Sequence, residues 1–184
     1  MRADARKNYD QILAVAREVF AADGAEASLR DIARKAEVGM GTLYRHFPTR
    51  EALLEVILRE RFEALAASAD APADGQPPDA ALLAWLREII AFTHQHSGVL
   101  GAMAAAIDAP ESALHASCVS LKSAGARLLA RAQAAGKARP DLEGIDLFAL
   151  ISAMAWLYDQ PAFAHRADHL FAVITGAVVK QGKA

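Results

Sequence analysis

Cysteine is almost absent from this 184-residue chain, and long apolar runs are absent as well. The single cysteine, Cys118, excludes an internal disulfide framework and a zinc site built on cysteines. The longest apolar stretch, residues 147–158, is too short to span a bilayer and lies between two aspartates. The N-terminus, MRADARKNYD, has no apolar core of the kind that export signals carry. We therefore expect a cytoplasmic protein without membrane contact.

A strong net charge is lacking too. The net charge of −2 and the pI near 6.3 argue against a general polyanion binder. The distribution is more informative than the total, because residues 28–50 carry five Lys and Arg side chains against two Asp and Glu. Any nucleic-acid surface is therefore expected in this segment.

The rest of the composition favours helices, because alanine is abundant and proline is confined to a few places. Apolar residues recur at helical spacing, and we find no convincing strand or internal repeat. Ser28 and Thr49 have the position and chemistry of helix N-caps, and Pro110 fits a first helical turn. The pattern predicts an all-α fold of about nine helices, at about 8–22, 28–36, 40–47, 50–68, 80–96, 98–107, 110–135, 143–159 and 164–180.

Two of these helices are short and flank a tight turn, which is the pattern of a helix-turn-helix unit. The preceding helix supports this unit. The second of the two short helices can enter the major groove of DNA. Leu43 and Phe47, four residues apart, are expected to point inward and fasten that helix. Tyr44, Arg45 and His46 lie between them and are expected to face outward as hydrogen-bond donors.

Residues 28–54, SLRDIARKAEVGMGTLYRHFPTREALL, resemble the DNA-binding segment of TetR-type bacterial transcription regulators. The resemblance implies a three-helix DNA-binding domain, here residues 1–50, and a helical ligand-binding and dimerisation domain, residues 51–184. It implies base-edge or groove contacts by Arg30, Met40, Gly41 and Arg45, and phosphate contacts by Thr42, Tyr44, His46 and Arg50. Phosphate contacts set register and affinity, whereas base contacts set sequence preference.

The motif departs from the family pattern at two positions. Glu37 occupies the turn position that is usually glycine and often has a positive φ, a backbone conformation uncommon for other residues. Gly39 replaces the usual Ser or Thr cap before the second short helix. Both departures predict a softer turn.

The last two predicted helices are the best candidates for a dimer interface, because the first of them is apolar on almost every side. A single recognition helix reads few base pairs, so such domains act in pairs on a palindrome. In the resembled family, equivalent helices of two subunits form a four-helix interface. We expect an interface that includes Phe148, Ile151, Leu170, Ile174, Ala177 and Val178, with packing inside one chain as the alternative.

Residues 80–135 are expected to enclose a cavity for a small molecule. No cluster of like charges points to a charged ligand, so an apolar or aromatic molecule is the default. Packing in the core is the alternative role for every residue that we expect to line this cavity. These residues are Trp85, Phe92, His96, Met103, Leu121 and Trp156.

Together these features predict a repressor that binds a palindromic operator in double-stranded DNA as a homodimer and is released by a small molecule. We expect it in the bacterial cytosol, nucleoid-associated when bound, with no catalytic site, cofactor or metal.

One alternative is a small-molecule-binding module without DNA binding. Another is an enzyme with Cys118 as its nucleophile, although His115 is the sole activating feature nearby. His165 and His169 have a metal-compatible spacing, but a solvated pair is the expected role.

Overall fold

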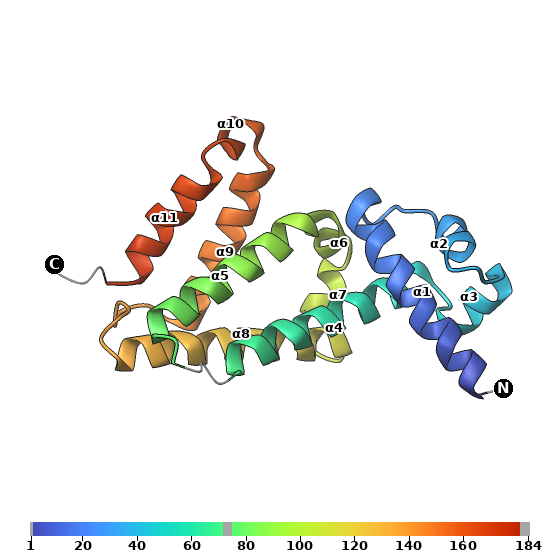
Figure 1. Ribbon diagram of the computed structural model, residues 1–184, viewed down its shortest axis with the longest axis horizontal. Helices are drawn as coiled ribbons and strands as arrows, with labels where there is room; N and C mark the ends of the chain where they lie inside the picture. The colour runs from blue at the N-terminus through green and yellow to red at the C-terminus, as the bar shows by residue number, and fades with distance from the viewer. Residues whose placement is uncertain (1, 72–74, 181–184) are drawn as a thin grey trace. The chain divides into compact units, whose positions relative to one another are not determined.

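The computed structural model describes residues 2–71 and 75–180 (Figure 1). Over these ranges the chain forms eleven helices and no strand, which confirms the predicted all-α class. Within the same ranges, no helix combines the length and the apolar character that crossing a membrane requires. The helices are α1 (Arg2–Asp23), α2 (Leu29–Lys35), α3 (Met40–His46), α4 (Arg50–Asp70), α5 (Pro78–Gln95), α6 (Ser97–Ala102), α7 (Ala104–Asp108), α8 (Ala113–Ala134), α9 (Gly144–Asp159), α10 (Pro161–Ala164) and α11 (Ala167–Val178).

The helix count exceeds the prediction of about nine because one predicted helix is interrupted and one short helix is additional. The predicted helix 98–107 divides into α6 and α7 at Met103. The predicted helix 164–180 corresponds to α11, and α10 is a short additional helix before it. The predicted start near Pro110 is also wrong, since the Ser112 hydroxyl accepts a hydrogen bond from His115 N at 2.9 Å and caps α8 there.

The described chain packs as two compact units. The first unit comprises Met1–Arg61 and His96–His115, and the second comprises Phe62–Gln95 and Ala116–Ala184. The unit that contains the helix-turn-helix therefore extends beyond residue 50 and includes α6 and α7. The helix α4 contributes residues to both units.

In the first unit, α1, α2 and α3 pack against one another around a common core. The apolar residues of α1 that recur at helical spacing are buried, with Ile12 fully inaccessible to solvent. Ile32 of α2 and Leu43 of α3 are equally inaccessible. An ion pair between Arg17 and Glu60 joins α1 to α4. This packing fixes the position of α3 within its unit.

In the second unit, α9 packs against α5, α10 and α11. Trp85 of α5 is buried, and its indole Nε1 donates a hydrogen bond to Leu65 O at 2.9 Å. Phe148 lies edge-on to the indole, with ring centroids 6.2 Å apart. A Cβ atom on Gly125 of α8 would lie 2.6 Å from Trp85 Cη2, so this position requires glycine for the indole to fit.

Candidate functional site

The helix-turn-helix is built by local signals at each helix end. The Ser28 hydroxyl accepts a hydrogen bond from Asp31 N at 3.3 Å, as its predicted capping role requires. Val38 N donates to Ala33 O at 3.0 Å and closes the turn after α2. Thr49 Oγ1 accepts from Ala52 N at 3.1 Å and caps α4 directly after α3. Three helix termini are thus fixed within about twenty residues of sequence.

The turn itself contains the two departures from the family pattern. Glu37 has a φ of 53°, so the left-handed conformation expected at this position is adopted by a residue with a side chain. Gly39 is the N-cap of α3 and makes no side-chain hydrogen bond. A Cβ atom on Gly39 would have no heavy atom within 4 Å, so the site has room for a capping side chain.

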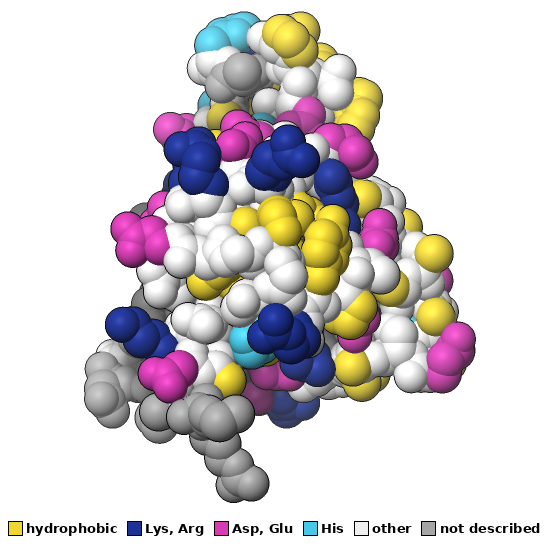
Figure 2. All heavy atoms as spheres, turned by 90° about the vertical axis from the view of Figure 1, so that its right-hand side faces the viewer, with side chains coloured by type: hydrophobic (Ala, Val, Ile, Leu, Met, Phe, Trp, Pro, Cys, Tyr) yellow, Lys and Arg dark blue, Asp and Glu magenta, His cyan; other side chains and the backbone are white. Residues whose placement is uncertain are grey.

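The recognition helix α3 is anchored from one side and exposed on the other. Leu43 is fully buried and Phe47, directly after the helix, is 2% exposed. Between them, Tyr44 is 48% exposed and Arg45 is exposed as well. Figure 2, which looks onto the side where Figure 1 draws α1–α3, shows Lys and Arg side chains around a hydrophobic patch, with Asp and Glu among them.

Two predicted phosphate-binding residues also take part in the packing of the first unit. His46 is half-buried, with its ring 6.0 Å from that of Tyr9 and 6.4 Å from that of Phe47. Arg50 Nη1 donates a hydrogen bond to Ala25 O at 2.7 Å and is 28% exposed. Any phosphate contact of Arg50 would therefore use its other N–H groups.

The remaining predicted DNA-binding residues lie at the surface of the same unit. Arg30 and Gly41 are exposed, whereas Met40 and Thr42 are half-buried. A Cβ atom on Gly41 would meet no heavy atom within 4 Å, so packing within the protein does not explain a glycine there.

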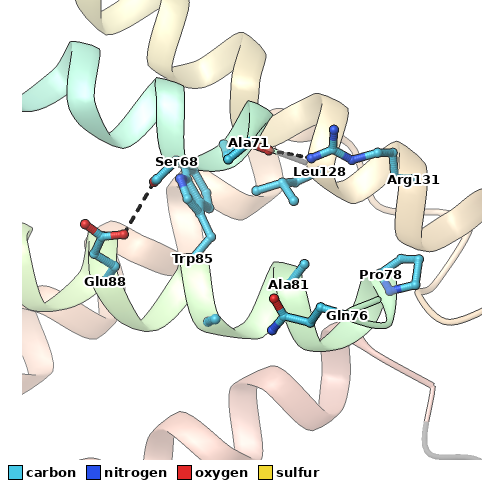
Figure 3. A pocket seen from close by; sticks show the side chains of 11 residues that line it. Ser68, Ala71, Gln76, Pro78, Ala81, Trp85, Glu88, Leu128 and Arg131 are labelled. Carbon is cyan, nitrogen blue, oxygen red and sulfur yellow. Dashed lines mark hydrogen bonds between the residues drawn. The ribbon is translucent and has the colours of Figure 1, made fainter. Parts of the chain in front are cut away.

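The second unit contains a pocket of about 260 Å³ at the end of α4, beside α5 and α8 (Figure 3). Its wall combines aromatic, small apolar and charged side chains, among them Ser68, Gln76, Trp85, Glu88, Leu128 and Arg131. Because the indole N–H is already bonded to Leu65 O, Trp85 offers the pocket an apolar ring surface.

Two side chains of opposite charge, Glu88 and Arg131, flank this apolar surface. Ser68 Oγ donates to Glu88 Oε2 at 3.4 Å, and the Arg131 guanidinium donates to Ala69 O (Figure 3). The pair Arg127–Asp70 lies close by, with Arg127 Nε 3.0 Å from Asp70 Oδ1. The hydrogen bond from Arg127 lowers the pKa of Asp70 below its ordinary value. The carboxylate of Asp70 is therefore ionised at neutral pH.

The residues predicted to line a cavity are dispersed in the structure. Trp85 lies on the pocket, whereas Phe92 packs edge-on against Phe62 with ring centroids 6.0 Å apart. Leu121 is buried in the second unit, and His96 and Met103 belong to the first unit. Trp156 is 59% exposed and lies on the surface instead.

The predicted dimer residues divide between the interior and the surface. Ile151 and Val178 are buried, so they pack inside the chain rather than on its surface. Phe148, Leu170 and Ile174 are half-buried, and Ala177 is exposed. On α9, Ile145 is 75% exposed and Trp156 is 59% exposed. Residues 145, 149, 152 and 156 form one exposed stripe, opposite the buried face of the helix.

Other reactive side chains are scattered over the described residues. Cys118 is half-buried on α8, and His165 and His169 are exposed. No group of three or more His, Cys, Asp and Glu side chains in the described ranges is arranged to hold a metal ion. Burial, with a smaller effect of the Asp168 charge, raises the pKa of Tyr158, which therefore stays protonated at neutral pH.

Tyr9, Glu88 and Arg131 contribute to the packing of the recognition helix and to the pocket but are not predicted from the sequence. Tyr9 stacks on Phe47 with ring centroids 5.1 Å apart, a contact between residues distant in sequence that periodicity does not reveal. Glu88 and Arg131 lie on the pocket from two different helices. The aromatic character of Tyr9 on the buried side of α1 is a sequence signal for its contact with Phe47. No sequence signal indicates that Glu88 and Arg131 line one pocket.

Two family models match the chain. Residues 12–57 match the bacterial regulatory proteins of the tetR family, and residues 77–176 match the C-terminal domain of SbtR-like transcriptional regulators. Together these matches include the helix-turn-helix and most of the second unit.

Solved structures and curated proteins agree with these matches. The TetR transcriptional regulator SCO0520 from Streptomyces coelicolor is 35% identical, with a TM-score of 0.73 over 94% of this chain and 99% of that one. A TetR regulatory protein from Mycobacterium vanbaalenii is 29% identical, with a TM-score of 0.72 over 97% and 98%. The regulator UidR of Escherichia coli K12 is 38% identical over 68 residues, 36% of this chain and 35% of UidR. The chain thus matches about a third of the length of such curated relatives. It belongs to the TetR family of bacterial transcription regulators and carries that family's helix-turn-helix DNA-binding domain.

Proposed function

We propose that this protein is a repressor that binds a palindromic operator as a homodimer and leaves it when a small molecule binds the second unit. The main support is the construction of α3, whose exposed Tyr44 and Arg45 are held in place by the buried Leu43 and Phe47. An exposed arginine on a rigid helix can pair with guanine through two hydrogen bonds, worth about 1–3 kcal/mol of discrimination. DNA is found in the bacterial cytosol, and we place the protein there, at the nucleoid when bound.

The exposed stripe of α9 supports dimerisation. Ile145 and Trp156 are large apolar side chains at its two ends, and Val173 of α11 is 56% exposed. Exposed apolar patches of this kind on a folded protein mark interaction sites. The proposed interface includes this stripe together with Phe148, Leu170, Ile174 and Ala177 at its border.

This interface can be tested by the molar mass of the protein in solution. Trp156→Lys should convert a dimer to a monomer, because it places a charge where apolar surface is buried. Val119→Lys is the matched control, since Val119 is a 46% exposed apolar residue on α8. Equal masses for both variants and the wild type would place the interface elsewhere.

The pocket beside Trp85 is the proposed ligand site. Its ring and small apolar walls suit an apolar or aromatic ligand, and its volume of about 260 Å³ limits that ligand to a small molecule. Coupling of about 1–3 kcal/mol between ligand and operator would suffice to change occupancy. A ligand that binds the wild type but not Trp85→Ala, and that releases DNA, would support this assignment.

The DNA-binding proposal requires an operator, which selection of genomic fragments by the purified protein can supply. Fluorescence anisotropy should then show tight binding, and Tyr44→Ala with Arg45→Ala should weaken it and remove the preference for the operator over scrambled DNA. Lys122→Ala, a change of an exposed cation on α8, should leave binding intact. Selection that enriches no fragment would favour the alternative of a ligand-binding module without DNA binding. Turnover that depends on Cys118 would favour an enzyme.

A further inference from the structure

The first turns of α1 adjoin the recognition helix through a cluster of aromatic rings. Tyr9 stacks on Phe47 with ring centroids 5.1 Å apart and planes 26° apart. The same ring lies edge-on to His46 at 6.0 Å. His46 is the last residue of α3, so Tyr9 places this part of α1 directly beside the C-terminal end of the recognition helix.

Basic side chains extend from this cluster to solvent. The Arg6 guanidinium lies 6.0 Å from the centre of the Tyr9 ring and is 77% exposed. Lys7 follows it and is exposed as well. Figure 2 shows Lys and Arg side chains on opposite sides of the hydrophobic patch on this face. Exposed basic side chains of the first unit therefore also lie outside the segment 28–50 that the sequence singles out.

Among the described residues, the acidic partner of Arg6 is Asp10, and Arg6 Nε lies 3.1 Å from its Oδ1 and 3.2 Å from its Oδ2. Both groups are mainly exposed, and ion pairs between exposed groups are weak and screened by salt. These bonds use Nε, so the two terminal nitrogens of the guanidinium can donate to another acceptor. A phosphate oxygen is a strong acceptor for that geometry.

We propose that Arg6 and Lys7 of α1 form an additional contact with the DNA phosphate backbone, beside the recognition helix. A helix in the major groove lies between two phosphate backbones, and a neighbouring helix can reach one of them. Tyr9 acts as a positioning residue, because it holds this end of α1 against His46 and Phe47. The inference rests on the proposed operator binding by α3 and adds to it a contact that carries no base preference.

Salt dependence of binding measures this contact directly. Each phosphate contact contributes about 0.9 to the slope of log K against log salt concentration, so Arg6→Gln in both subunits of a dimer should reduce the slope by about 1.8. Affinity at about 0.1 M salt should fall on the order of tenfold, equally for the selected operator and for a duplex of scrambled sequence. Lys7→Gln should act in the same direction, and Arg6→Lys should retain most of the slope.

Arg17→Gln is the matched control, because it removes the same charge from the same helix. Arg17 lies eleven residues further along α1, about 16 Å along its axis, and pairs with Glu60. It should leave the slope at the wild-type value, with thermal unfolding confirming that each variant is folded. A wild-type slope that Arg6→Gln and Lys7→Gln leave unchanged would overturn the α1 contact alone. No binding of the wild type to either duplex at any salt concentration would refute DNA binding and the α1 contact together.

Discussion

Replacing Glu37 with glycine should stabilise the first unit, because the turn holds this residue in a left-handed conformation with a φ of 53°. That conformation costs a residue with a side chain roughly 1–2 kcal/mol, and glycine avoids the cost. Glycine also makes the unfolded chain more flexible, which removes about 0.4–1 kcal/mol of the gain. The net expectation is an increase of about 0.4–1 kcal/mol in the free energy of unfolding.

The charge of Glu37 changes in the same variant and must be separated from the backbone effect. The carboxylate lies just beyond the C-terminus of α2, where the helix dipole disfavours a negative charge by a few tenths of a kcal/mol. Glu37→Ala removes the charge but keeps a Cβ atom at positive φ. The difference between Glu37→Gly and Glu37→Ala therefore isolates the backbone cost.

Urea unfolding at a fixed protein concentration is the appropriate assay, because dimerisation makes stability depend on concentration. The midpoint should rise for Glu37→Gly while the denaturant slope stays constant. Glu37→Asn should fall between glycine and alanine, since Asn tolerates the left-handed region. If Glu37→Gly is no more stable than Glu37→Ala, the left-handed backbone at this position stores no strain and the explanation is refuted.

Three further predictions concern other positions. Gly41→Ala should stabilise α3 by up to about 1 kcal/mol, because its Cβ has free space within the protein. If the proposed close approach of DNA to this backbone holds, the same change should weaken operator binding, and unchanged affinity would contradict that contact. Gly125→Ala should destabilise the second unit by about 1–3 kcal/mol in thermal melts, since its Cβ would meet the buried Trp85 ring, and a neutral result would contradict the packing. The lowered pKa of Asp70 contributes stability that is present at neutral pH and is lost as pH falls and the carboxylate becomes protonated. Arg127→Gln should therefore lower unfolding midpoints at pH 7 and approach the wild type in acid, and a deficit that persists once Asp70 is protonated would refute the pair.

The sequence predicts the helix-turn-helix well because its signals are local. Ser28 and Thr49 cap the helices that follow them, and both hydrogen bonds form within three residues. Leu43 and Phe47 are buried because a spacing of four places both on one face of a helix turn. The left-handed backbone conformation of Glu37 also has a local cause, because it follows from the shape of the tight turn between α2 and α3.

The second unit is less predictable because its packing joins distant segments. Because α9 is apolar on most sides, the periodicity of its apolar residues does not predict which face is buried. In the structure Ile151 faces inward and Trp156 faces solvent. The pocket combines Glu88 of α5 with Arg131 of α8, and no spacing rule links them. Alanine-rich sequence also conceals the break at Met103, since it favours helix on both sides.

Anisotropy titration of the selected operator at two salt concentrations tests the central claim most directly. The wild type should bind tightly, and its affinity should fall steeply between about 50 and 200 mM salt. Tyr44→Ala with Arg45→Ala should lose the preference for the operator over scrambled DNA, whereas Lys122→Ala should keep it. A double variant that binds the operator as tightly and selectively as the wild type would contradict the assignment of α3 as the recognition helix.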